Sequence, residues 1–174
     1  ISLQETLSPY TYNLQPLHRI ECYDASNSAM YDSTVSMTVM TDGLLDNGQY
    51  RRFKIKNPRA VSDFDRLDEA LTRRLKNTSW SIPDLIVIDG GIPQLRRLQR
   101  IFDKQDNPPK YLGLAKHPDR LILSGDSQKV SEWIIVKLPA DHPGLQLLEQ
   151  LRDEAHRFAN AYRKILERKR TKLS

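Results

Sequence analysis

Apolar and polar residues alternate along three stretches in the first third of the chain. In STVSMTVMTDG (residues 33–43), every second residue from Val35 to Val39 is apolar, and the turn signal Asp42-Gly43 follows. A period of two is typical of a half-buried strand. The stretches HRIECYD (residues 18–24) and QYRRFKIK (residues 49–56) also have strand character. Because short links join the three stretches, the pattern predicts an antiparallel meander.

The apolar spacing then changes to a helical period. Ser62 can cap a helix, and Asp65 three positions later approximates a capping box. One face of this helix is apolar and consists of Phe64, Leu67, Leu71 and Leu75. A second helix is predicted for PQLRRLQRIF (residues 93–102), where Pro93 stands in the tolerant first turn. Between the helices, the apolar run in DLIVID (residues 84–89) predicts a strand buried on both faces.

The last third of the chain predicts two more strands or hairpins and a long helix. KYLGLAK (residues 110–116) is a strand candidate, and residues 120–138 read as a hairpin around Gly125-Asp126. A helix of about 20 residues starts at Pro143. Its core stripe consists of Leu148, Leu151, Ala155, Phe158 and Tyr162. The whole order predicts an α/β fold, with a mixed sheet of three antiparallel strands followed by parallel strands, and helices packed on both faces.

Composition narrows the class of protein. The chain has 174 residues, 39% hydrophobic and 28% charged, which is typical of one soluble globular domain. No apolar run approaches the roughly 20 residues that span a bilayer, so we expect no membrane association. The N-terminus has no secretory signal pattern. The single cysteine, Cys22, excludes an internal disulfide framework and a multi-cysteine zinc site. A cytoplasmic location is therefore predicted.

The net charge of +5 is concentrated near the C-terminus. Residues 163–172 hold six basic residues and one acid, so the remainder of the chain is neutral. Such a stretch suits a phosphate backbone, although a solvated helix end that runs into a linker explains it equally well. Residues 1–17 contain Pro9 and Pro16 and little periodicity, and they are predicted to be a leader or linker.

Two predicted strands end in an acid, Asp24 and Asp89. In a mixed sheet of this order, the first and fourth strands can lie side by side and parallel, which brings the two carboxylates together at one sheet edge. Two adjacent carboxylates repel each other unless a cation or proton intervenes. Mg²⁺ or Mn²⁺ is the natural cation because both prefer oxygen ligands. A turn-forming role for each acid is the alternative.

His156 is the third candidate for chemistry. It follows Ala155 of the core stripe but lies about 100° further round the helix, at the edge of the buried face. Such a histidine can ligate a metal, transfer a proton or contact a phosphate. Asp153, three residues earlier, is on the same side and either orients the ring or is solvated. A lone helical histidine is more often structural or exposed.

Five stretches, considered together, resemble one family. They are RIECYDAS, YRRFKIK, DLIVIDGG, LGLAK and LPADHPGLQLLEQLRDEAHRFA, and they fall within residues 19–159. They are similar to the C-terminal endonuclease domain of UvrC, the incision subunit of bacterial nucleotide excision repair. The resemblance implies a ribonuclease-H-like fold and a catalytic, metal-binding triad of Asp24, Asp89 and His156. It also implies a Mg²⁺- or Mn²⁺-dependent endonuclease that cuts 5′ to a DNA lesion.

The resemblance further implies an organisation and partners. Residues 18–162 would form the endonuclease domain, and residues 163–174 a basic tail leading to a DNA-binding module that this chain does not contain. Damaged double-stranded DNA would be the substrate, and a UvrB-type helicase subunit would bind through other parts of a longer protein. Candidate DNA contacts are Lys116, Arg157, Gln94 and Arg51, with a solvated surface as the alternative for each.

Two departures from the family pattern and two rival functions accompany this interpretation. After the first acid the family usually has Ile, whereas this chain has Ala25. The family often has Lys-Gly after Asp-Gly-Gly, whereas this chain has Ile92 and Pro93. A phosphate contact made by that lysine would then be lost. The first rival function is a non-catalytic DNA-binding or scaffold module on the same fold. The second is another ribonuclease-H-like repair nuclease, such as one that recognises deaminated bases.

Overall fold

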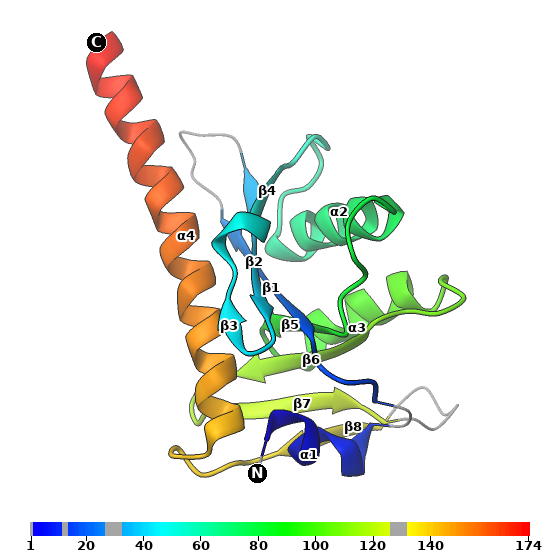
Figure 1. Ribbon diagram of the computed structural model, residues 1–174. Coiled ribbons are helices and arrows are strands. Elements are labelled where there is room, and N and C mark those ends of the chain that lie inside the picture. Colours follow the sequence, from blue (N-terminus) through cyan, green and yellow to red (C-terminus); the bar gives the residue numbers. More distant parts are fainter. Residues whose placement is uncertain (1, 12–13, 27–32, 126–131) are drawn as a thin grey trace.

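A computed structural model of the protein describes residues 2–11, 14–26, 33–125 and 132–174. Its centre is a mixed eight-stranded sheet with the order β3-β2-β1-β5-β6-β7-β8, in which β4 also pairs with β2 (Figure 1). The strands are β1 (Arg19–Ser26), β2 (Thr34–Thr41), β3 (Leu44–Leu45), β4 (Arg51–Lys54), β5 (Leu85–Asp89), β6 (Lys110–Ala115), β7 (Arg120–Ser124) and β8 (Trp133–Val136). The helices are α1 (Leu3–Leu7), α2 (Asp63–Lys76), α3 (Ile92–Phe102) and α4 (Pro143–Leu173), with short 3₁₀ turns at Ser8–Tyr10 and Asn47–Gln49.

The strand pairing confirms the meander and the parallel strands that the sequence predicted. Strand β2 pairs antiparallel with β1, β3 and β4. Strand β5 lies between β1 and β6 and is parallel to both. Strands β6, β7 and β8 continue the sheet in antiparallel fashion, as expected of a hairpin after β6. The turn residue Asp126 lies outside the described residues. The parallel centre matters most, because it aligns the carboxyl ends of β1 and β5.

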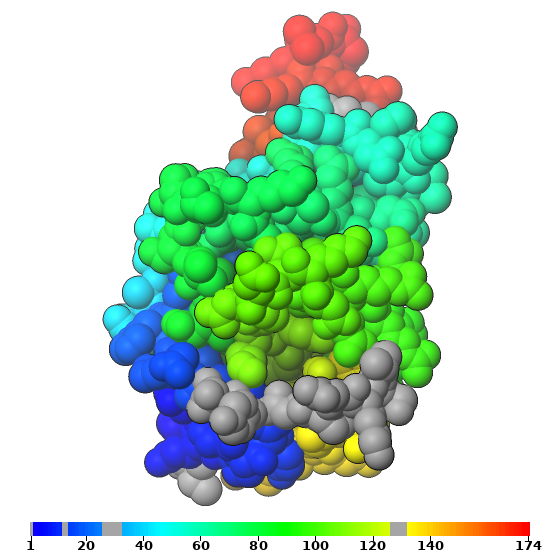
Figure 2. Space-filling model, turned by 90° about the vertical axis from the view of Figure 1, so that its right-hand side faces the viewer, coloured from blue at the N-terminus to red at the C-terminus, as the bar shows by residue number. Residues whose placement is uncertain are grey.

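Helices cover both faces of the sheet. Helices α1 and α4 pack on one face, where Cys22 of β1 and Val87 of β5 are buried. Helices α2 and α3 pack on the other face over Tyr23 and Ile88. Figure 2 shows this second face, where residues of α2 and α3 (green) form the middle of the surface and the end of α4 (red) projects beyond it. The alternation of buried residues along each strand therefore decides which helix a side chain meets.

The local signals for α2 and α3 act as predicted. The Ser62 side chain accepts a hydrogen bond from the Asp65 backbone N–H, and the Asp65 side chain accepts one from the Ser62 backbone, which completes a capping box. Leu67 and Leu71 of α2 are buried on the face of the helix that packs on the sheet. Pro93 lies within the first turn of α3. The capping box and Pro93 therefore mark where α2 and α3 begin.

Both ends of the chain are more ordered than the sequence pattern suggested. Within residues 1–17, predicted as a leader, helix α1 buries Leu3 and Leu7 against the core beneath α4. The prediction of about 20 residues for α4 was too short, since the helix has 31 residues and ends at Leu173. No glycine or proline follows Gly144, so nothing in the chain stops the helix before its basic stretch. Among the described residues, no helix is long and apolar enough to cross a membrane.

Candidate active site

The strand register places Asp24 and Asp89 on one face of the sheet. Tyr23 of β1 lies opposite Ile88 of β5 in the parallel pair, so the acid that follows each is at the same level. Side chains alternate across a strand. Both acids therefore face the same way as the buried Cys22 and Val87, toward α4. The two carboxylates emerge where their strands end, at the margin of the core.

Helix α4 supplies the third group. Its stripe of Leu148, Leu151 and Ala155 is fully buried, which fixes the rotation of the helix over the sheet. His156 then lies at the edge of that stripe, with Nε2 2.8 Å from Asp89 Oδ2 and 3.8 Å from Asp24 Oδ2. The side chains of Asp24, Asp89 and His156 are 21%, 23% and 33% exposed, so a ligand in solvent can reach them. Three residues that are distant in sequence thus meet at one point.

Lys116 brings a positive charge to the same point. Leu114 of β6 lies opposite Asp89, and Lys116 is two residues further along the chain on the same side. Its Nζ lies 3.9 Å from Asp89 Oδ2. The turn that carries it is tied to α4 by Arg152, whose guanidinium donates to both carboxylate oxygens of Asp119 at 3.3 Å. Arg152 is one helical turn before His156, so both contacts use the same flank of α4.

Burial controls the electrostatics of Asp24. Loss of water is the main reason why the pKa of Asp24 is raised, and the neighbouring Asp89 carboxylate raises it further, while His156 and Lys116 oppose the shift. Burial, followed by Asp24 and Asp89, also raises the pKa of the Cys22 thiol. Cys22 is fully buried, so it is a packing residue and not a nucleophile. A divalent cation would relieve the repulsion between the carboxylates.

The raised pKa of Asp24 leads to a prediction about stability. The pKa of Asp24 is higher in the folded protein than the unfolded value of about 3.9. The folded state therefore loses stability as the pH rises through the folded-state pKa, and it keeps that stability in full below the unfolded pKa. In the metal-free protein, Asp24→Asn removes this loss. We expect the variant to melt at a higher temperature than the wild type at pH 7, with the difference disappearing near about pH 3. Thermal melts in EDTA that show equal or lower stability at pH 7 would contradict this.

The donor atoms fit a divalent ion with an open coordination sphere. Mg²⁺ is usually bound through one or two carboxylates and keeps several waters, and Mn²⁺ also accepts an imidazole nitrogen. Within the part of the chain that the structure describes, no group of three or more His, Cys, Asp and Glu side chains, the triad included, is arranged to hold a metal ion. Asp24 and Asp89 would therefore hold the ion, and His156 either completes its shell or remains outside it. An open site leaves positions for water and a phosphate oxygen.

Comparison with known proteins places this chain in a family. A family model described as the UvrC RNase H endonuclease domain matches residues 10–160. The chain belongs to the UvrC RNase H endonuclease domain family. A relative from Dictyoglomus thermophilum, named UvrABC system protein C, is 38% identical, and the match covers 91% of this chain and 26% of the relative. A relative of the same name from Prosthecochloris aestuarii is 36% identical over 98% of this chain and 26% of its own length. The chain thus spans about a quarter of these relatives.

The UvrC family match confirms the ribonuclease-H-like fold expected from the sequence, and it decides against the rival of a different nuclease family. Two solved structures show a looser likeness. Human ENDOV is 17% identical with a TM-score of 0.45, over 65% of this chain and 56% of that one. Endonuclease V from Ciona intestinalis, in complex with a DNA containing inosine, is 15% identical with a TM-score of 0.42, over 66% and 54%.

The other DNA contacts expected from the UvrC resemblance lie in different surroundings. Arg157 is exposed but donates two hydrogen bonds to Glu154, at 2.6 and 2.8 Å, so its charge is already paired. Gln94 accepts a hydrogen bond from the Gly91 backbone N–H at the start of α3. This is a capping contact beside the site. Of the four candidates, Lys116 has its charged group within 4 Å of a triad atom.

Arg51 lies on the other side of the sheet. It pairs with Met37, which is buried beneath α2 and α3. Its guanidinium donates to the carbonyls of Gly48 and Tyr50 and lies 5.2 Å from the centre of the Trp80 ring. Since the triad faces α4, Arg51 cannot contribute to the same surface. Its neighbour Arg52 points toward α4 instead. Arg52 was not among the candidate DNA contacts, although the alternation of side chains along β4 places it on the face opposite Arg51.

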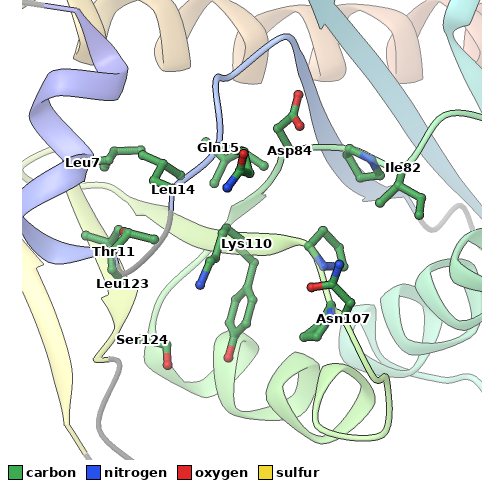
Figure 3. Close-up of a pocket in the computed structure, with 15 residues that line it drawn as sticks. Leu7, Thr11, Leu14, Gln15, Ile82, Asp84, Asn107, Lys110, Leu123 and Ser124 are labelled. Atoms are coloured by element: carbon green, nitrogen blue, oxygen red, sulfur yellow. The ribbon is translucent and has the colours of Figure 1, made fainter.

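A separate hollow lies at the opposite end of the parallel strands (Figure 3). Its lining includes Leu85 and Lys110, which are the first residues of β5 and β6. Strands of this length place their two ends roughly 15 Å apart. Asp89 is at the far end of β5, so this hollow is not part of the triad site. Nearer the triad, His156, Asn160 and Lys164 line an open surface hollow along α4.

Proposed function

We propose that this chain is a metal-dependent DNA endonuclease that hydrolyses a phosphodiester bond at Asp24, Asp89 and His156. Within a longer UvrC-type protein in the cytoplasm, it would make the cut 5′ to a lesion in damaged double-stranded DNA, together with a UvrB-type helicase subunit. The observation that carries the proposal is the convergence of two strand-end carboxylates and an imidazole beside a lysine, with His156 Nε2 2.8 Å from Asp89. This set suits phosphate hydrolysis better than a scaffold role.

Each residue of the site has a distinct task. Mg²⁺ or Mn²⁺, when bound, polarises the scissile phosphate and lowers the pKa of an attacking water. Asp24 and Asp89 would hold the ion at the margin of the core, where partial burial lowers the effective dielectric constant and strengthens their attraction for a cation. His156 would complete the metal shell or transfer a proton at Nε2. Lys116 Nζ would bind a phosphate oxygen near Asp89 and so orient the DNA backbone.

The test of this function is nicking of supercoiled plasmid DNA carrying lesions. We expect the purified chain to convert supercoiled into open-circular DNA in Mn²⁺, more slowly in Mg²⁺, and not in EDTA. Nicks should carry a 3′ hydroxyl, which a DNA polymerase can extend without prior treatment. Failure to nick in any divalent metal, both as the isolated chain and joined to the rest of a UvrC relative, would favour the scaffold role.

Substitution of His156 separates its two possible tasks. We expect His156→Ala to reduce the Mn²⁺-dependent nicking rate by roughly 10²- to 10⁴-fold, because a positioned proton donor or acceptor contributes about that much. Isothermal titration with Mn²⁺ then assigns the role. Unchanged metal affinity with loss of one limb of the pH–rate profile indicates proton transfer, and a large loss of affinity indicates ligation. A rate within about twofold of the wild type would remove His156 from the mechanism.

A further inference from the structure

The strand register places Arg52 on the same face as the triad. Asp24 of β1 lies opposite Ser36 of β2, and Ser36 lies opposite Arg52 of β4. Residues directly opposite each other in a sheet point to the same side. Asp24 and Arg52 are thus two strand spacings apart, roughly 10 Å between Cα atoms. Ser36 between them is buried beneath α4, while Arg52 is exposed.

Aromatic side chains of α4 hold the Arg52 guanidinium. Its central carbon lies 3.7 Å from the centre of the Phe158 ring and 4.6 Å from that of Tyr162. Phe158 is two residues after His156, about 200° round the helix, so Arg52 and His156 lie on opposite flanks of α4. A guanidinium stacked on aromatic faces has a restricted plane and loses little entropy when it binds an oxyanion.

The charge of Arg52 has no acidic partner among the residues that the structure describes. In contrast, two arginines of α4 are paired, Arg157 with Glu154 and Arg152 with Asp119 in the turn before β7. Contact with the rings removes water and lowers the pKa of Arg52, but an arginine stays protonated at neutral pH. A partly dehydrated, unpaired guanidinium is a favourable site for an anion, because its cost of dehydration is already met in the free protein.

We propose that Arg52 binds a backbone phosphate of the DNA on the flank of α4 opposite His156, as a second anchoring point for the duplex. This inference rests on the proposed function and extends it to the way the substrate is held. The planar fork of arginine matches two phosphate oxygens. The Cα atoms of Asp24 and Arg52 are roughly 10 Å apart, which is within the span of one groove of a duplex, since the major groove is about 12 Å wide. A duplex can therefore present phosphates to the triad and to Arg52 together.

The chain supplies a matched control in the adjacent residue. Arg51 has the same charge and comes from the same strand, but it faces α2 and α3, where it contacts backbone carbonyls and Trp80. A non-specific loss of positive charge would affect both positions equally. A phosphate contact at the α4 flank would depend on Arg52 alone.

The experiment measures binding of the chain to a fluorescein-labelled duplex in EDTA over a range of NaCl concentrations. Arg52→Met keeps a long apolar stem over the rings and removes the charge, and Arg52→Gln provides a second neutral variant. We expect either to weaken binding by roughly 5- to 20-fold at low salt and to make the slope of log K against log salt shallower by about 0.9. Arg52→Lys should retain the slope, and Arg51→Met should bind within about twofold of the wild type.

Several outcomes would overturn the inference. They are an unchanged slope and affinity in Arg52→Met and Arg52→Gln, an equal loss in Arg51→Met, and no DNA binding by the wild type at low salt. Thermal melts of each variant identify a change that is only structural, since a purely structural role lowers stability without altering the salt slope. Because binding is measured without metal, a shallower salt slope in Arg52→Met and Arg52→Gln together with absent nicking by the wild type would refute the incision activity and still support the Arg52 contact.

Discussion

Replacing Asp24 or Asp89 with Asn should lower the rate of Mn²⁺-dependent DNA nicking by roughly 10²- to 10³-fold or more, because each carboxylate is asked to hold the ion that stabilises the developing charge. The two substitutions act on one site, so the double variant should be little slower than either single variant. Asn preserves the size of each side chain, which keeps the strand ends intact. Nicking of plasmid DNA measures the activity, and titration with Mn²⁺ measures the affinity for the metal. We expect each variant to lose both the activity and the affinity.

Asp153→Asn is the matched control for these variants. Asp153 is on α4 three residues before His156, but its side chain is 71% exposed and pairs with Arg152. We expect nicking by this variant to stay within about twofold of the wild type. If Asp24→Asn and Asp89→Asn retained more than about a tenth of wild-type activity, or if Asp153→Asn lost as much as they do, the two strand-end acids would not be the metal site.

The second large effect concerns the stability of β1. Glu21 is fully buried on the α2 side of the sheet and accepts hydrogen bonds from Arg74, at 2.8 Å, and from the Tyr23 hydroxyl, at 2.6 Å. Arg74 is itself only 2% exposed. Glu21→Gln leaves that guanidinium buried without a countercharge, and we expect it to reduce the free energy of unfolding by about 3 to 5 kcal/mol. Urea unfolding followed by circular dichroism measures the change.

Two further variants bracket this result. Replacing both partners, Glu21→Leu with Arg74→Met, should recover part of the lost stability, because the fully buried guanidinium is removed together with its carboxylate. Recovery is incomplete because Arg19, only 11% exposed, also donates to Glu21, at 2.9 Å, and loses that partner. Glu167→Gln breaks the exposed pair with Arg163, where both side chains are more than half exposed, and should cost less than about 1 kcal/mol. A loss below about 1 kcal/mol in Glu21→Gln would show that the buried pair does not hold β1 in place.

Much of the fold follows from patterns that the chain carries locally. The alternation in residues 33–43 and the capping residues Ser62 and Asp65 act over a few positions, and the structure confirms the strand and the capping box. The prediction that this strand is half-buried was wrong, because helices cover both faces of the sheet and the polar residues Ser36 and Thr38 of β2 are buried as well. The parallel pairing of β1 and β5 followed from the order of elements. Helix α1 was missed because its two buried leucines, Leu3 and Leu7, are too few to show a period and are stabilised by contacts with distant parts of the core.

The site itself could be predicted as three residues but not as a complete surface. Asp24, Asp89 and His156 each had a position that the strand ends and the helical stripe could identify, and their convergence follows from the fold. The sequence alone could not identify which side chains share a face of the sheet or form an ion pair along the helix. Whether Arg51 or Arg52 faces the triad depends on the register of β4 against β2, and the pairing of Arg157 with Glu154 depends on side-chain geometry.

The anomalous signal of a crystal soaked in Mn²⁺ shows whether the two strand-end carboxylates bind a metal. We expect a peak between the carboxylates of Asp24 and Asp89, with oxygen distances of about 2.0 to 2.2 Å and with His156 in or next to its coordination shell. The same soak of Asp89→Asn should show no peak. An ion bound elsewhere while the space between the two carboxylates stays empty would contradict the assignment of this site.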